Sequence, residues 1–360
     1  MPPADRMTYH PDTRLPQRVA LGVLLRSFPP VRVDQVLDAA GRREQRQRLL
    51  PARLMVYFTL SMWIFKSLPY ELILTEILQD APGLAPPVGL EEPASAAAIG
   101  RARRRLGVEP LRLLFDQAAG PSAAAGPAQR HGLRPVRLRQ VEVGVPATPA
   151  NLLGFASAAR QAGPPLSAQL SLLIEDGTGR IVAAEVTDAY AAQPALERLL
   201  DGALPADSLL VMDERPLSAR VWTAAERLGV ELLWPLQEQA QSAHGSRLPD
   251  GSLLGKLPAD DGSELVARVV YRTGDGAVGA GGPPARFATT ILDHRAVPAA
   301  DLVALFDERR SAASAFDGLG AGGGADRLEL RSKDPEMVRQ EIYAMLCVQH
   351  AIGDLVGPAW

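Results

Sequence analysis

Apolar residues in the first third of the chain recur every three or four positions, a spacing typical of amphipathic and buried helices. Prolines interrupt the pattern at Pro29, Pro51 and Pro69, and a proline-rich stretch follows at 81–95. Since proline restricts the residue before it and lacks a backbone donor, these positions separate the elements. The pattern predicts helices over residues 15–27, 31–47, 51–66 and 69–79, and over 95–121 with an interruption.

The segment 95–106, with the sequence SAAAIGRARRRL, has the clearest two-sided pattern. Ser95 is a suitable N-cap, because its hydroxyl can accept a bond from a first-turn N–H. Ile99, Ala102 and Leu106 share one face of such a helix, which leaves Arg101, Arg104 and Arg105 on the outside. The helix therefore presents an arginine row to solvent.

After about residue 132 the pattern changes from helical spacing to alternation and short apolar runs, which are typical of strands. Three strands come first, and helices and strands then alternate. This order predicts a mixed sheet followed by added β structure and two final helices. The expected strands are 133–145, 167–176, 180–188, 207–213 and 230–236, and the expected helices are 193–202, 217–228, 299–319 and 334–355.

The composition restricts the partners and the cellular location that can be expected for the protein. The 360 residues are 47% hydrophobic and carry a formal net charge of −3, so any contact with nucleic acid has to come from local clusters of arginine. Cys347 is the single cysteine, which excludes an intrachain disulfide and favours a cytoplasmic location. The longest apolar run, 54–65, is too short to span a membrane. No membrane partner is expected.

Two segments near the C-terminus have residues at a characteristic spacing: FDERRSAASAFDGLG at 306–320 and LRSKDPEMVRQEIYAML at 330–346. They resemble the C-terminal signature of the insertion-sequence-4 family of DDE transposases. In that family a Tyr, an Arg, a Glu and a Lys follow one another at fixed spacing, and the Glu is a metal ligand. The corresponding residues here are Phe306, Arg309, Ala313 and Gly320.

The other two metal ligands of that family are aspartates at strand ends. An ungapped count back from VPATPANLLGFA at 145–156 places the first on Arg139. The second corresponds to Asp213, within LLVMDERPLS at 209–218. The resemblance therefore predicts a DDE site in which one carboxylate, Asp213, remains, and Arg309 is left to contact phosphate.

The resemblance runs from about Leu15 to about Val356 and implies the domain organisation. The fold class is then α+β or α/β: a helical N-terminal domain and a ribonuclease-H-like mixed-sheet domain with a β-rich insertion. The predicted division is a disordered segment 1–14, a helical DNA-binding domain 15–121, a linker 122–132, and a ribonuclease-H-like domain 133–356 with its insertion at about 237–295.

Two-metal phosphoryl transfer needs carboxylates that converge on both ions, and Mg²⁺ takes hard oxygen ligands. With Arg139 and Ala313 at two of the three positions, the sequence predicts no bound metal and no nuclease activity. Mg²⁺ would be the cofactor if activity remained. Asp213 is then a turn or capping residue, or at most a weak ligand. Asp317, one turn beyond Ala313, is the one carboxylate placed to substitute.

The leading hypothesis is a domesticated, transposase-derived protein that binds double-stranded DNA and is nucleoid-associated. Its DNA-binding residues are predicted to be Arg101, Arg103, Arg104 and Arg105. A second arginine cluster, RREQRQR at 42–48, is interpreted as a solvated helix face because of Glu44. A homodimer stays open. Two alternatives also stay open: an active transposase that uses Asp213 with relocated carboxylates, and a protein-interaction scaffold.

Overall fold

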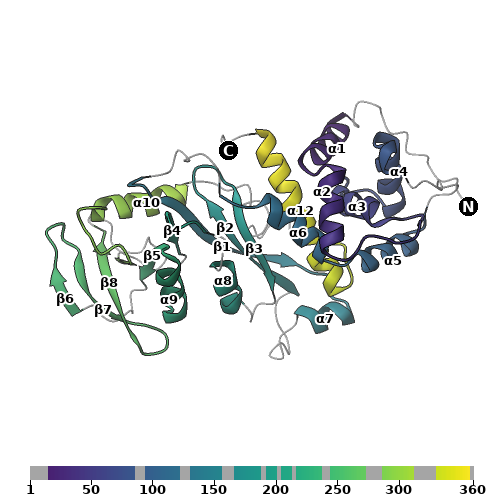
Figure 1. The fold of residues 1–360 in the computed structure, drawn as a ribbon. Helices are drawn as coiled ribbons and strands as arrows, with labels where there is room; N and C mark the ends of the chain where they lie inside the picture. Colours follow the sequence, from purple (N-terminus) through teal and green to yellow (C-terminus); the bar gives the residue numbers. More distant parts are fainter. Residues whose placement is uncertain are drawn as a thin grey trace, which may run out of the picture. The chain divides into compact units, whose positions relative to one another are not determined.

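The computed structural model (Figure 1) divides into two compact units along the chain. One unit comprises Met1–Ala118 with Leu330–Val356, and the other comprises Ala119–Glu329 with Gly357–Trp360. The predicted disordered segment 1–14 and residues 122–129 of the predicted linker lie outside the described residues. The structure describes residues 15–85, 94–121, 130–155, 166–187, 192–200, 204–212, 216–236, 244–272, 286–311 and 330–356.

The first unit is helical throughout the part that the structure describes. Its core forms around α3, whose residues from Leu54 to Met62 are all buried, as its uniformly apolar sequence predicts. The helices are α1 (Leu15–Ser27), α2 (Pro30–Ala39), α3 (Ala52–Ile64), α4 (Tyr70–Asp80), the 3₁₀ helix η2 (Pro82–Leu84), α5 (Ala96–Leu106), α6 (Glu109–Ala118) and α12 (Pro335–Val356).

The last helix, α12, corrects the predicted domain boundary, which assigned all of 133–356 to the sheet domain. It packs against α1, α3, α5 and α6. The Trp63 indole donates to the Glu341 carbonyl at 2.8 Å, and Cys347 is fully buried. Because the apolar face of α12 is buried against the N-terminal helices, the end of the described chain belongs to the first unit.

A second correction concerns the predicted helix 31–47, because α2 ends at Ala39. Gly41 follows with φ of +62°, a left-handed conformation that glycine adopts readily and that commonly ends helices. Residues 41–51 therefore form a loop that carries the first arginine cluster, and this loop contributes to the site described below.

The second unit is built on one nine-stranded sheet in the order β3-β2-β1-β4-β5-β9-β8-β7-β6. Strands β1, β2 and β3 pair antiparallel, whereas β4 and β5 run parallel to β1. This is the ribonuclease-H-like arrangement that the order of elements predicts. The strands are β1 (Arg134–Gly144), β2 (Ser167–Glu175), β3 (Ile181–Thr187), β4 (Ser208–Val211), β5 (Glu231–Leu236), β6 (His244–Arg247), β7 (Leu253–Pro258), β8 (Glu264–Tyr271) and β9 (Arg286–Thr289).

Helices lie on both faces of this sheet, and α7 (Pro149–Phe155) follows β1. On one face, α8 (Ala192–Leu200) and α9 (Ala219–Leu228) pack over a core that includes Val136 and Leu138 of β1. On the other, α10 (Ala299–Ser311) packs over Leu209 and Val211 of β4. Strands β6 to β9 extend the sheet antiparallel, within the range predicted for the insertion. No helix in the described ranges combines the length and the apolarity that crossing a bilayer requires.

A buried arginine ties the extension to α10. Arg268 of β8 is fully buried, donates to the Ser252 hydroxyl and the Val297 carbonyl at 2.9 and 2.8 Å, and pairs with Asp250. Asp250 also accepts the backbone N–H of Ala299 at 3.1 Å. Burial favours the neutral carboxyl, but the hydrogen bonds from Ser252, the charge of Arg268 and the Ala299 N–H outweigh it and lower the pKa of Asp250 to about 2.

This ion pair predicts an acid-sensitive second unit. Because the folded pKa of Asp250 lies below its ordinary value of 3.8, its stabilisation is complete above that value and is lost as the pH falls toward 2. We expect about 2 kcal/mol of unfolding free energy to disappear over this window. Urea titrations between pH 2 and 6 should show the loss in the parent and a flatter profile in Asp250→Asn. Asp293→Asn, at an exposed position of the same unit, is the control and should keep the parental profile. A parental profile in Asp250→Asn would contradict the assignment.

Candidate nucleic-acid interface

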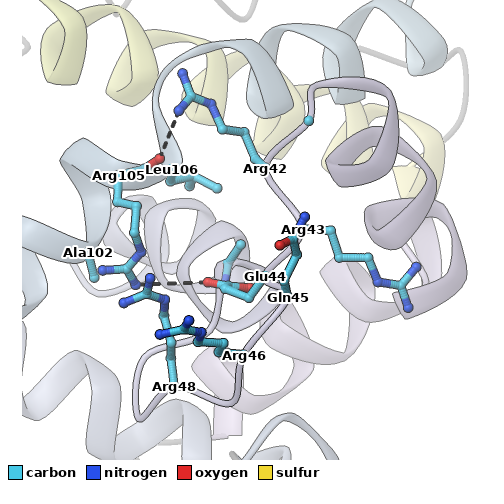
Figure 2. Close-up of a pocket in the computed structure, with 11 residues that line it drawn as sticks. Arg42, Arg43, Glu44, Gln45, Arg46, Arg48, Ala102, Arg105 and Leu106 are labelled. Carbon is cyan, nitrogen blue, oxygen red and sulfur yellow. Dashed lines mark hydrogen bonds and ion pairs between the residues drawn. The ribbon is translucent and has the colours of Figure 1, made fainter.

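The loop that follows α2 and the C-terminal turn of α5 enclose a pocket of about 440 Å³ (Figure 2). Its lining is dominated by arginine, with a single carboxylate. Both arginine clusters of the sequence contribute, although they lie more than fifty residues apart along the chain. The charged lining residues are Arg42, Arg43, Glu44, Arg46, Arg48 and Arg105.

Arg42 holds the loop against the end of α5. Its guanidinium donates to the Arg105 carbonyl at 3.4 Å, near the C-terminus of the helix, where a cation is favoured. The same guanidinium packs on Gly107, where an added Cβ would lie 3.3 Å from it and where φ is +72°. A side chain at position 107 would be strained, so glycine there permits this close approach.

Two further contacts fix the loop at its other side. Glu44 accepts the Ala52 N–H at 2.7 Å, at the N-terminus of α3, where a carboxylate is stabilised by the helix dipole. Arg43 pairs with Asp38 at 2.7 Å and lies 3.6 Å from Asp34, and Figure 2 shows it directed away from the other arginines. The charge of Arg43 is therefore already balanced.

Arg105 is the anchored cation of the pocket. Its Nη2 donates to the Leu50 carbonyl at 2.7 Å and lies 3.9 Å from a Glu44 carboxylate oxygen. Burial, and then the positive charge of Arg48, lower the pKa of Arg105, while Glu44 acts in the opposite direction. Arg105 therefore sits in a locally positive environment.

Arg46 and Arg48 are exposed, and in the part of the chain that the structure describes neither makes a hydrogen bond or an ion pair. Figure 2 shows their side chains gathered beside that of Arg105. Neither residue was predicted as a site residue, because the sequence pattern predicted a solvated helix over this segment. Gly41, directly before the cluster, was the available signal that the helix ends there.

The predicted exposed row of α5 is confirmed, whereas Arg103, which the predicted DNA-binding set also included, is not on the surface. Arg101, Arg104 and Arg105 are exposed. Arg103 is fully buried and donates to Gln340 Oε1 at 2.8 Å, the Tyr70 hydroxyl at 3.0 Å, and groups of the α12 segment. Its guanidinium is used inside the helical unit, so we remove Arg103 from the predicted DNA-binding set.

The predicted metal site can be followed only at its first position. Arg139 of β1 pairs with Leu172 of β2, and two residues earlier Arg137 is in register with Val211 of β4. Because strand residues alternate, Arg137 and Arg139 lie on the face where α10 packs, opposite Val136 and Leu138. Arg137 is largely buried and lies 2.9 Å from Asp176.

Asp213, Ala313, Asp317 and Gly320 lie outside the described residues, as does the side chain of Arg309, although α10 includes that residue. Phe306 is buried, with its ring centroid 4.7 Å from that of Phe287. Within the described ranges no three His, Cys, Asp or Glu side chains are grouped to hold a metal ion. A guanidinium cannot ligate Mg²⁺, so Arg139 does not fit the ligand position implied by the resemblance.

Comparisons with known proteins find similarity to transposases. Residues 18–116 match the family described as insertion element 4 transposase N-terminal. Over 342 residues the chain is 25% identical to transposase InsG for insertion sequence element IS4 of Escherichia coli (strain K12), with 90% of this chain and 74% of that protein covered.

A solved structure, the pre-cleavage Mos1 transpososome, is matched at 14% identity over 60% of this chain and 77% of that one. Its TM-score of 0.17 carries no weight, so the fold assignment rests on the strand order. The chain is thus similar to insertion-sequence transposases, and in particular to those of insertion sequence 4.

Proposed function

We propose that this protein binds double-stranded DNA through its helical unit and has lost the DDE chemistry of its relatives. The observation that carries the proposal is the distribution of arginine: exposed arginines gather on the helical unit, while Arg139 occupies the face of β1 that should supply a metal ligand. The first feature favours a polyanionic partner. The second disfavours catalysis.

The argument for lost chemistry is electrostatic. Two-metal transfer requires carboxylates that bring two divalent ions roughly 3.5–4 Å apart. Arg139 brings a guanidinium to that face, and the guanidinium of Arg137, two residues away, is already paired with Asp176. Positive charge raises the cost of placing a divalent cation nearby, and neither side chain supplies an oxygen ligand. No Mg²⁺ cofactor is therefore part of the proposal.

The argument for DNA rests on local charge, since the whole chain is slightly acidic. Guanidinium groups suit phosphate geometry, and each phosphate that is neutralised releases condensed counterions. Arg101, Arg104 and Arg105 lie one turn apart or less on an exposed helix face. An active enzyme using Asp213 and a protein-interaction scaffold are the alternatives, and neither is favoured by a contact in the described residues.

The test is a salt series. Anisotropy of a labelled 20-base-pair duplex should report binding that weakens as KCl rises, and Arg101→Ala/Arg104→Ala/Arg105→Ala should weaken it further. The slope of log affinity against log salt should fall by about 0.9 for each phosphate that the variant no longer neutralises. A folded triple variant with parental affinity and slope, or a parent that does not bind DNA, would support the scaffold alternative.

The matched control removes charge elsewhere on the same unit. Arg26, Lys66 and Lys333 are exposed and lie outside the pocket and the α5 row. Arg26→Ala/Lys66→Ala/Lys333→Ala removes the same formal charge as the triple variant and should change binding less. In the same reactions, Mg²⁺ or Mn²⁺ should produce neither nicking nor joining of DNA that carries inverted repeats from the protein's own locus. Metal-dependent cleavage that disappears in Asp213→Ala would restore the enzymatic alternative.

A further inference from the structure

Five arginines line the pocket beside α5, of which Arg43 is paired with Asp38 and Arg42 binds the end of the helix. The other three, Arg46, Arg48 and Arg105, share the pocket with one carboxylate, Glu44. Arg105 has a backbone acceptor and a distant carboxylate, and within the described residues Arg46 and Arg48 have no acceptor at all. With Glu44 counted, the group retains two positive charges. Cations gathered in this way repel one another unless an anion lies between them, so the arrangement favours an anionic ligand.

The pocket is held in place rather than formed by free side chains. Arg42 binds the end of α5 on one side of the loop, and Glu44 binds the first N–H of α3 on the other. Leu50, buried at the end of the loop, accepts from Arg105 at 2.7 Å. A site whose backbone is already ordered loses less entropy when it binds a ligand.

Phosphate is the anion that this geometry suits. Arginine donates through a rigid, planar fork that matches two phosphate oxygens, and several arginines can surround one phosphate group. The pocket volume of about 440 Å³ is also larger than a single phosphate ion needs. Arg46 and Arg48, which are exposed, lie where the pocket opens to solvent. A site for a continuous sugar–phosphate chain has to be open in this way.

We propose that Arg46, Arg48 and Arg105 form a clamp for one backbone phosphate of DNA, and that Glu44 limits the strength of this clamp. The inference rests on the proposed function, because DNA supplies the phosphate. It extends the proposed DNA-binding surface beyond the arginine row of α5 to the loop that carries Arg46 and Arg48. It also assigns a role to the carboxylate, since a negative charge in the pocket opposes the ligand.

The clamp predicts a specific change in salt dependence. In Arg46→Ala/Arg48→Ala the remaining charge of Arg105 is offset by Glu44, 3.9 Å away, so the clamp no longer neutralises its phosphate. The slope should then fall by about 0.9 if the phosphate is shared, whereas two separate phosphates would lower it by about 1.8. Affinity at 100 mM KCl should fall at least tenfold, roughly the loss of one or two charge-assisted hydrogen bonds. Arg26→Ala/Lys66→Ala is the control with the same change in formal charge.

Glu44→Gln tests the clamp in the opposite direction. Glutamine keeps an oxygen that can accept the Ala52 N–H but removes the negative charge. Binding should become roughly threefold tighter, the effect of one unit charge about 6 Å away in water, with the slope unchanged. A residue with only a structural role would not produce tighter binding. Circular dichroism should show that all these variants remain folded.

Inorganic pyrophosphate, titrated calorimetrically into the full chain, separates the sources of phosphate. DNA binding that falls in Arg46→Ala/Arg48→Ala and rises in Glu44→Gln supports the clamp. Parental slopes in the double variant, or weaker binding by Glu44→Gln, overturn the clamp while leaving DNA binding in place. A parent that binds pyrophosphate through these arginines but does not bind DNA overturns both the DNA assignment and the proposed function.

Discussion

Replacing Arg103 by alanine should destabilise the helical unit by about 3 kcal/mol or more, because each buried acceptor that loses its donor costs about 1–3 kcal/mol. Arg103 is fully buried, and its guanidinium donates to four groups on other segments. Alanine would leave a cavity lined by Gln340 Oε1 and the hydroxyls of Tyr70 and Ser332. Those groups would lose a donor without regaining water.

Hydrogen exchange can show that the loss of stability in Arg103→Ala lies in the helical unit. Peptides from α5 and α12 should lose protection in Arg103→Ala, and urea denaturation should show the loss of free energy. Arg104→Ala, the exposed neighbour on the same helix, is the control and should stay within about 0.5 kcal/mol of the parent. Arg103→Lys should be intermediate, because an ammonium cannot reproduce the guanidinium fork. Equal stability of Arg103→Ala and Arg104→Ala would contradict the structural role.

The burial of Arg103 was legible in the sequence but was obscured by its neighbours. Position 103 lies four residues after Ile99 and three before Leu106, which places it on the apolar face of α5. Residues 101–105 contain four arginines, so composition suggested a uniformly basic surface. The helical period, applied strictly, separates Arg103 from the other three. Its partners on α12, more than two hundred residues later, could not be inferred from local pattern.

The arginine pocket was predictable in its residues but not in their arrangement. Both clusters were recognised, and the exposed side of α5 was predicted correctly. The convergence of Arg46 and Arg48 on Arg105 depends on a loop that folds back after Gly41, and loop paths are set by tertiary contacts such as that of Arg42 with the end of α5. Glu44 was interpreted as a sign of a solvated helix face, whereas it accepts the Ala52 N–H at the start of α3.

The sheet was more predictable than the loops. Alternation and the order of elements predicted the central strands and a mixed sheet, because the sense in which strands pair follows from the length and handedness of their connections. The pairing of β5 with β9, which attaches the extension to the sheet, joins strands about fifty residues apart and left no mark in the local pattern. The position of α12 was likewise decided by long-range burial.

Restoring the missing carboxylates should create a measurable metal site. We expect Arg139→Asp with Ala313→Glu to raise Mg²⁺ affinity at least tenfold, because a cation is replaced by an oxygen ligand and a second carboxylate is added where the resemblance expects one. Calorimetric titration, or Mn²⁺ binding followed by electron paramagnetic resonance, gives the affinity. Position 313 lies outside the described residues, so the design rests on the family's spacing there.

The control for this design uses the alternation of β1. Gln140 is the next residue of the strand and lies on the opposite face, so Gln140→Asp with Ala313→Glu adds the same two carboxylates without bringing them together. It should bind Mg²⁺ no better than the parent. Equal affinity of the two designs would show that Arg139 does not occupy the first ligand position. DNA cleavage is not expected to return with the metal, because Gly320 stands where the family has a lysine, and ion binding alone does not position the reacting phosphate.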